Sequence, residues 1–215
     1  MRNKIFILGE AGQIGSVLKK TLEALNFEIV LEDDADIIAL CVSSEIAEPY
    51  LLNSNKILLN FTTNKIIKTN VINGIGCSTL SVIKPLLIII KELFNKILDV
   101  NVVTLFPQNA LSNKSKLKNQ IKNIPIYTYE HKHQEEIENI LGLTVNMSHF
   151  ITPVESGIVS SITIKFKEQV HLKLVNYECF TRDKITWNII SRVDNLQEPI
   201  DYMINKLNLK IKENK

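Results

Sequence analysis

The first seventy residues carry short apolar runs that alternate with segments of helical spacing. Residues 4–9 (KIFILG) form a continuous apolar run that ends in glycine, as expected of a strand buried on both faces of a sheet. The segments that follow are predicted as helix, strand, strand, helix and strand, in that order: 16–25, 27–31, 35–42, 45–52 and 56–61. This β-α-β-β-α-β order favours a parallel sheet with helices on its faces.

Beyond residue 76 the pattern changes. A long amphipathic helix is predicted over 78–94, and a shorter one over 135–141 with Gly142 as its C-cap. The final helix is predicted over 199–211. Between these helices lie strand-like and often alternating segments, which indicate a largely antiparallel sheet: 100–106, 124–129, 143–151, 157–166, 170–178 and 184–190.

We therefore predict an α/β protein with two differently built parts. Residues 1–75 are expected to form a Rossmann-like parallel-sheet unit that binds a nucleotide, joined by a C-terminal helical segment over 187–215. Residues 76–186 are expected to form an α+β domain with a mixed or antiparallel sheet, which serves catalysis and dimerisation. The alternating strands within 159–175 need cover for their apolar face, and a second copy of the chain is the expected cover.

Composition narrows the classes of function. The 215 residues include 25 basic and 23 acidic side chains, for a net charge of +2, so no electrostatic feature points to nucleic acid or an anionic membrane. Three cysteines stand far apart, and none belongs to a CxxC pair, which argues against disulfides and zinc. The longest apolar run, 86–90, is too short to span a bilayer. We expect a soluble, cytoplasmic protein.

The stretch GEAGQIG (9–15) lies between the first strand and its helix. Glycines at 9, 12 and 15 in this position direct backbone N–H groups and the positive helix end toward a pyrophosphate. The alternative is a tight turn that binds nothing. Glu32 follows the second strand at a distance suited to a ribose 2′-OH, which favours NAD over NADP. Only Glu32, Asp33 and Asp34 separate that strand from the next, so the adenine end of the site is reduced.

Cys77 begins the long helix, in the stretch INGIGCSTLSV. A cysteine at this place is either a nucleophile, whose thiolate the helix N-terminus stabilises, or a small apolar residue of the core. The first alternative predicts a lowered pKa for the thiol and faster alkylation than at Cys41 or Cys179.

The motif order resembles that of the semialdehyde dehydrogenase family, which contains aspartate-semialdehyde dehydrogenase and N-acetyl-γ-glutamyl-phosphate reductase. The resemblance runs from about residue 4 to 205 and rests on GEAGQIG, ADIIALCV, KILLNFTTNK, GCSTLSVIKPLL and SRVDNL. GCST is similar to the first branch, whereas EHKHQEEIENI (130–140) and GIVSSI (157–162) are similar to the second. The chain is identified as a shortened and divergent member.

The resemblance implies an NAD(P)-dependent reduction of an acyl phosphate to a semialdehyde in amino-acid biosynthesis, through a thioester on Cys77. It also implies a homodimer. The implied catalytic residues are Cys77, His131, His133 and Gln108. The implied substrate anchors are Lys65 and Lys132. The implied cofactor-binding residues are Gly9, Gly12, Gln13, Ile14, Gly15, Glu32 and Asn195.

Departures from the family pattern leave a second function open. The family's Asn-Pro before the nucleophile is Gly74-Ile75 here, and Gln197-Glu198-Pro199 replaces a cation and small residues after Asp194-Asn195-Leu196. The chain is therefore either a compact reductase of weakened activity or a catalytically silent relative that binds or regulates.

Overall fold

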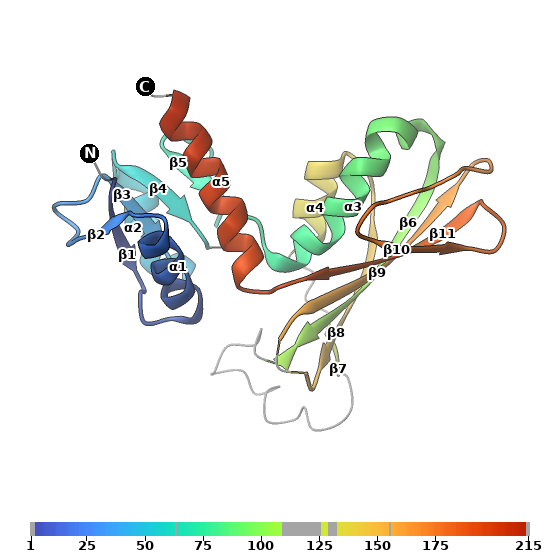
Figure 1. The fold of residues 1–215 in the computed structure, drawn as a ribbon, viewed down its shortest axis with the longest axis horizontal. Helices are drawn as coiled ribbons and strands as arrows, with labels where there is room; N and C mark the ends of the chain where they lie inside the picture. Colours follow the sequence, from blue (N-terminus) through green and yellow to red (C-terminus); the bar gives the residue numbers. More distant parts are fainter. Residues whose placement is uncertain (1–2, 63, 109–125, 129–132, 155, 214–215) are drawn as a thin grey trace. The chain divides into compact units, whose positions relative to one another are not determined.

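The computed structural model describes residues 3–62, 64–108, 126–128, 133–154 and 156–213. It divides into two compact units, one formed by residues 1–75 and 196–215 and the other by residues 76–195 (Figure 1). No helix in the described part of the chain is long and apolar enough to cross a membrane.

The first unit contains a five-stranded sheet in the order β2-β1-β3-β4-β5, and every neighbouring pair is parallel. The predicted parallel sheet is therefore confirmed. The strand order reverses between β1 and β3, which is where open α/β sheets bind ligands. The strands are β1 (Lys4–Leu8), β2 (Glu28–Ile29), β3 (Ile37–Leu40), β4 (Ile57–Asn60) and β5 (Val71–Asn73). Strand β5 was not predicted, because three residues are too few to show a period.

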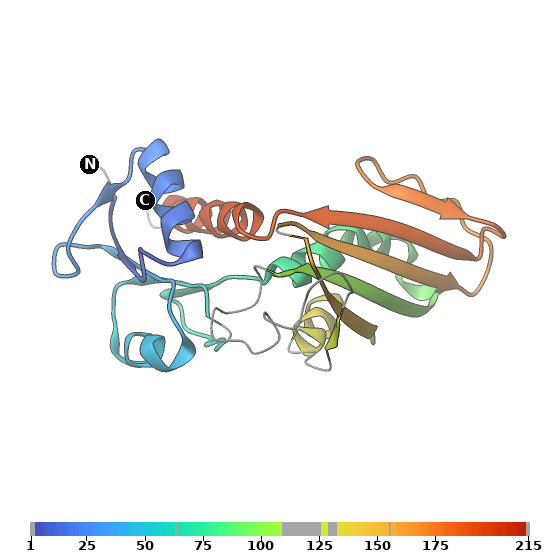
Figure 2. The same ribbon diagram turned by 90° about the horizontal axis from the view of Figure 1, so that it is seen from below.

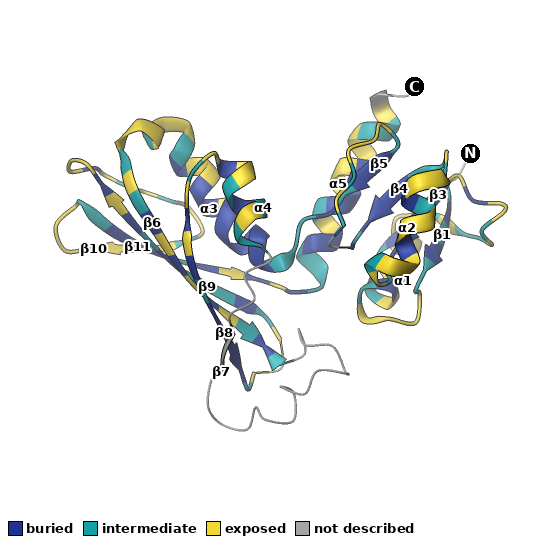
Figure 3. Cartoon of the chain, turned by 180° about the vertical axis from the view of Figure 1, so that it is seen from behind, coloured by how far each residue is buried: buried dark blue, intermediate teal, exposed yellow. Residues whose placement is uncertain are grey.

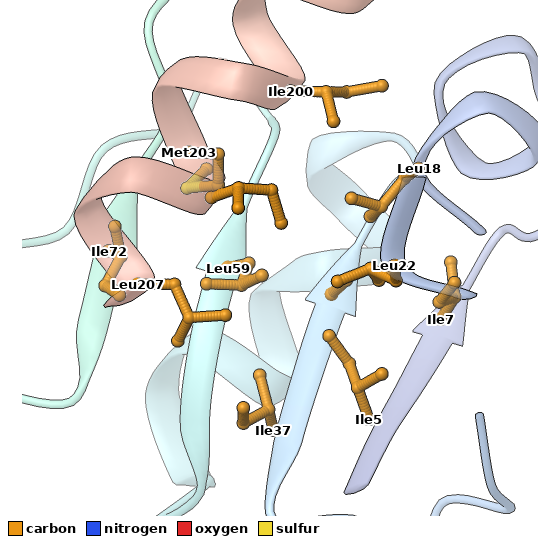
Figure 4. Packing of buried hydrophobic residues seen from close by; sticks show 12 residues of the cluster. Ile5, Ile7, Leu18, Leu22, Ile37, Leu59, Ile72, Ile200, Met203 and Leu207 are labelled. Carbon is orange, nitrogen blue, oxygen red and sulfur yellow. The ribbon is translucent and has the colours of Figure 1, made fainter. Parts of the chain in front are cut away.

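Helices cover both faces of this sheet. Helix α1 (Gln13–Ala24) and helix α5 (Gln197–Glu213) pack on one face, and α2 (Ser44–Asn53) packs on the other. In Figure 4, side chains of α1 and α5 meet alternate residues of the strands. Leu18 and Leu22 are fully buried there, and each contributes about 1.5–3 kcal/mol by leaving water. This packing fixes the turn between β1 and α1.

The second unit contains a six-stranded sheet in the order β10-β11-β9-β6-β8-β7. Its neighbours are antiparallel except β6 and β8, so the sheet is mixed, as predicted. The strands are β6 (Ile97–Pro107), β7 (Ile126–Thr128), β8 (Asn146–Thr152), β9 (Ile158–Phe166), β10 (Glu178–Thr181) and β11 (Thr186–Val193).

Two helices cover one face of this sheet (Figure 2). Helix α3 (Cys77–Leu93) packs on β6, β9 and β11, and α4 (Gln134–Leu141) packs on α3. A short 3-10 turn, η1 (Phe94–Lys96), follows α3. Gly142 caps α4 in the left-handed conformation, at φ 64°, as predicted.

In the described part of the second unit, no helix packs on the opposite face of this sheet. Along β9, buried positions alternate with partly exposed ones, as the colours of Figure 3 show. Val103 and Leu105 of β6 lie on the uncovered face and are 40% and 37% exposed.

Two predictions about segments were wrong. Residues 187–193 do not belong to the C-terminal helix but to β11, because Trp187, Ile189 and Val193 alternate toward the buried face. The segment 170–178 is not a strand up to Glu178, where β10 begins. Asn176 has φ 75°, a turn conformation that breaks the extended backbone there.

Candidate active site

Cys77 is the first residue of α3, directly after the N-cap Gly76. The backbone N–H groups of Cys77 and Ser78 act to lower the pKa of the thiol. The N–H of Leu80 donates to the Gly76 carbonyl oxygen over 2.9 Å and closes the first turn. The thiol therefore lies at the positive end of a 17-residue helix.

Burial raises the pKa of the Cys77 thiol to about 11. The two N–H donors lower this pKa, but they do not compensate for the loss of solvation, and the carboxylate of Asp194 raises it further. The prediction of a lowered pKa was therefore wrong. At neutral pH the sulfur carries its proton, so any nucleophilic attack needs a base that removes it.

The imidazole of His133 lies against Gly76, the neighbour of Cys77 in the chain. Its Cε1 lies 2.9 Å, and its Nδ1 3.2 Å, from the place that a Cβ on Gly76 would occupy. The ring therefore fills the space beside Gly76, the residue that precedes Cys77. The other two residues of the HKH stretch, His131 and Lys132, lie outside the described residues, and their roles stay predictions.

Two side chains that the sequence analysis did not select are linked to His133, Glu136 directly and Thr79 through Glu136. Glu136 Oε2 is 3.5 Å from His133 Nδ1 and accepts a hydrogen bond of 2.6 Å from Thr79 Oγ1. Their signal was present in the sequence: Thr79 is in the GCST motif, and Glu136 is in the stretch similar to the second branch. From the sequence alone, however, a glutamate in a short amphipathic helix is expected to be a solvent-exposed charge.

Buried hydroxyl groups hold α3 on its sheet. Ser81 Oγ lies 2.6 Å from Ser160 Oγ on β9, and Thr104 Oγ1 on β6 lies 3.2 Å from the same oxygen. All three residues are fully buried. Hydrogen bonds in such surroundings fix position because a mismatched arrangement would leave polar atoms unpaired. The start of α3, and with it Cys77, is thereby set against the sheet.

In the first unit, packing requires two glycines, Gly9 in the turn after β1 and Gly15 in the first turn of α1. Gly9 has φ 90°, and a Cβ there would lie 2.4 Å from the Cys41 carbonyl oxygen. A Cβ on Gly15 would lie 2.2 Å from the Gly9 carbonyl oxygen, so only glycine lets α1 approach the turn this closely.

Gly12 has a different explanation. It is the N-cap of α1 with φ −75°, a conformation open to any residue, and a Cβ would meet only the Gly9 oxygen within 3.2 Å and the Cys41 oxygen at 4.0 Å. Serine, aspartate or asparagine would cap the helix better. Packing requires glycine here less strictly than at positions 9 and 15, since only one backbone oxygen would lie closely against a Cβ, and such a glycine fits the close approach of a phosphate.

The helix that follows this turn offers its first N–H groups. Gln13 and Ile14 are its first residues; Gln13 is exposed, and Ile14 packs on the core. Among the described residues no side chain caps α1, and its first turn carries no acidic residue. The Gly12 region thus fits a dinucleotide pyrophosphate.

Glu32 is held by two contacts from neighbouring elements. Its carboxylate accepts a 3.0 Å hydrogen bond from the Tyr50 hydroxyl of α2, and its carbonyl oxygen accepts one of 2.6 Å from Lys56 Nζ. Burial and this carboxylate raise the pKa of Tyr50. Because Lys56 directly precedes β4, these contacts tie the short 31–35 turn to the amino end of that strand. The ribose role of Glu32 stays a prediction.

Lys65 donates to two carbonyl oxygens, those of Thr62 at 2.9 Å and Gly74 at 2.7 Å. The loop that carries it is further held by Asn60, whose Nδ2 donates to the Asn64 carbonyl oxygen (2.6 Å) and to Asn73 Oδ1 (2.8 Å). Lys65 thus fastens a loop. Its role as an anion anchor stays a prediction.

Gln108 and Asn195 both lie in the second unit. The Gln108 N–H donates to the Val154 carbonyl oxygen over 2.9 Å, just after β6. Asn195 is 9% exposed, and its Oδ1 accepts the Gly157 N–H over 3.1 Å. Within the described ranges, no group of three or more His, Cys, Asp and Glu side chains is placed to hold a metal ion.

Comparisons with known proteins agree with this geometry at the level of fold. No family model and no curated protein matches the sequence. Among solved structures, aspartate semialdehyde dehydrogenase II of Vibrio cholerae complexed with ASA matches with a TM-score of 0.77 and 12% identity over 99% of both chains. A probable aspartate-semialdehyde dehydrogenase of Pseudomonas aeruginosa matches with a TM-score of 0.78 and 10% identity over 100% of both chains.

The chain has the fold of the aspartate-semialdehyde dehydrogenases. The resemblance seen in the sequence motifs is therefore confirmed for the fold, at an identity that makes the chain a divergent example of it.

Proposed function

We propose that the chain is an oxidoreductase of the acyl-phosphate and semialdehyde type that works through a thioester on Cys77. The observation that carries this proposal is the start of α3. There, the thiol lies at the N-terminus of a 17-residue helix, whose first backbone N–H groups lower its pKa, and an imidazole packs on the residue before it. A thiol, donors for its negative charge and a base are the groups that acyl transfer to cysteine requires.

The chain's own residues would act in the following order. His133 takes the thiol proton, which is needed because the pKa of Cys77 is about 11. The sulfur then attacks the acyl carbon, a carbon–sulfur bond forms, and phosphate leaves with the electron pair of the broken carbon–oxygen bond. The helix N-terminus stabilises the negative charge at the sulfur before the attack. A reduced nicotinamide would supply the hydride that converts the thioester into the aldehyde.

The first unit would hold that cofactor. Gly12 leaves room for the pyrophosphate, and the first N–H groups of α1, at Gln13 and Ile14, would bind it. The short 31–35 turn gives the adenine less support than a longer crossover would. We therefore propose NAD or NADP as the cofactor, bound chiefly through its phosphates.

The reaction can be tested in reverse, as oxidation of the semialdehyde. In the proposal, this direction needs both the Cys77 thiol of the second unit and the cofactor held by the first. Aspartate semialdehyde, inorganic phosphate and NAD or NADP should yield reduced cofactor, followed by its absorbance, with the full chain. Cys77→Ser should abolish the signal, whereas Cys179→Ser should leave it unchanged. If neither NAD nor NADP is reduced, the result contradicts the proposal for this substrate class.

Two observations favour a second candidate, a silent relative that binds or regulates. The Cys77 thiol has a raised pKa, and the ammonium of Lys65 is engaged by two carbonyl oxygens. A silent relative would bind the dinucleotide in calorimetry or associate with a partner. It would not reduce NAD or NADP under any of the conditions above.

A further inference from the structure

The side chains of Thr79, His133 and Glu136 form one connected group where α3 meets α4. The Thr79 hydroxyl donates to Glu136 Oε2 over 2.6 Å, and the same oxygen is 3.5 Å from His133 Nδ1. Thr79 is fully buried, and the side chains of His133 and Glu136 are 32% and 20% exposed. The carboxylate is therefore directed inward between two partners and is not a solvated surface charge.

The orientation of the ring distinguishes its two nitrogens. Nδ1 faces the carboxylate of Glu136, and the ring plane is confined by Gly76, whose Cβ position lies 2.9 Å from Cε1 and 3.6 Å from Nε2. A carboxylate beside one ring nitrogen favours the tautomer that carries its proton there. Nε2 then has the free lone pair and is the nitrogen able to accept a proton.

We infer that Glu136, oriented by Thr79, is a positioning residue that keeps His133 protonated at Nδ1 and basic at Nε2. This inference rests on the proposed function in one respect, namely that Nε2 takes the proton of the Cys77 thiol. The placement of the ring proton is a property of the chain itself. Both parts of the inference rest on the position of one atom, Glu136 Oε2, which accepts the Thr79 hydrogen bond and lies beside His133 Nδ1.

The chain offers closely matched variants for a test. Glu136→Ala removes the carboxylate, whereas Glu135→Gln removes the adjacent, exposed carboxylate on the same helix turn. Thr79→Val removes the orienting hydroxyl at nearly constant shape, and Thr79→Ser restores a hydroxyl. Urea unfolding of all four variants shows which of them still fold.

The first measurement is the tautomer of His133, read from the ¹⁵N chemical shifts of its ring in the full chain, with His133→Ala to assign the signals. We expect the Nδ1–H form in the wild type and in Glu135→Gln, loss of that preference in Glu136→Ala, and an intermediate spectrum in Thr79→Val. Thr79→Ser should resemble the wild type. An unchanged tautomer in Glu136→Ala would overturn the inference, because a purely structural link between α3 and α4 would alter stability alone.

The second measurement is the rate of Cys77 acylation by acetyl phosphate. Glu136→Ala should lower it by roughly 10–100-fold, and Glu135→Gln by less than about twofold. Equal rates in these two variants would overturn the inference while leaving the proposed function intact. A wild-type chain that is not acylated, yet shows the tautomer change, would refute the proposed function and retain the positioning of His133 by Glu136.

Discussion

The imidazole of His133 occupies the space that a side chain on Gly76 would need. The two residues come from different motifs, GCST and EHKHQEEIENI, which resemble different branches of one family. In the folded chain they form one feature, since a Cβ on Gly76 would lie 2.9 Å from the ring. Glycine at position 76 is thus explained by the imidazole that packs there.

This relationship predicts non-additive stability. Gly76→Ala should destabilise the protein by about 1–3 kcal/mol, because the new methyl group overpacks against the ring. In a His133→Ala background the same substitution should cost much less, because the space is then empty. Urea unfolding of the four chains gives the coupling energy. Equal costs in both backgrounds would show that the ring does not lie against Gly76.

The raised thiol pKa predicts slow alkylation of Cys77. With a pKa of about 11, roughly 0.01% of the thiol is ionised at pH 7, so the rate of reaction with iodoacetamide should rise about tenfold per pH unit up to about pH 11. Cys41, whose pKa burial raises to about 12, should react still more slowly. Peptide mass spectrometry after timed labelling measures each site.

Substitution of Asp194 tests what raises the pKa of Cys77. Its carboxylate raises the pKa of Cys77, so Asp194→Asn should lower that pKa and accelerate labelling of Cys77 at neutral pH severalfold. Labelling of Cys41 should not change. A Cys77 rate that stays the same in Asp194→Asn would leave burial as the sole cause.

The glycine turn predicts two opposite outcomes for one kind of substitution. Gly15→Ala should destabilise the first unit by several kcal/mol, because its methyl group would lie 2.2 Å from a backbone oxygen. Gly12→Ala should change stability by less than about 1 kcal/mol but weaken dinucleotide binding, because it fills the phosphate position. Unfolding and calorimetry together separate the two. Normal dinucleotide binding by Gly12→Ala would contradict the proposed phosphate site.

The uncovered face of the six-stranded sheet predicts a homodimer. Val103 and Leu105 lie on that face, with Phe180 at 54% exposure on the same side, and a second copy of the face is the proposed cover. Light scattering at micromolar concentration should give a dimer, and Leu105→Glu a monomer. A wild-type monomer would contradict this assembly.

The parts of the fold that the sequence predicted are those set by local pattern. The run KIFILG and the glycines after it place a strand and a turn without reference to the rest of the chain, and Gly142 ends α4 by its own conformational freedom. Strand β5 was not predicted because three residues show no period, and the segment before β10 was mispredicted because a turn at Asn176 breaks its extended backbone.

The candidate site was predictable only in part, because some of its features depend on tertiary packing. The position of Cys77 at a helix start follows from the sequence around it. Its raised pKa does not, because burial against the sheet and Asp194 from the end of β11 are consequences of tertiary packing. Glu136 was overlooked because Thr79, which donates a hydrogen bond to it, becomes its neighbour only when α3 and α4 pack.

The most direct test of the account is whether Cys77 forms a thioester. The full chain is incubated with acetyl phosphate at neutral pH without nucleotide, quenched in acid, and examined by peptide mass spectrometry. We predict an acetyl group on Cys77 alone among the three cysteines, strongly reduced in His133→Ala and absent in Cys77→Ser. No adduct at Cys77, or equal acetylation of Cys77 and Cys179, would contradict a thioester mechanism and leave the silent relative as the function of this fold.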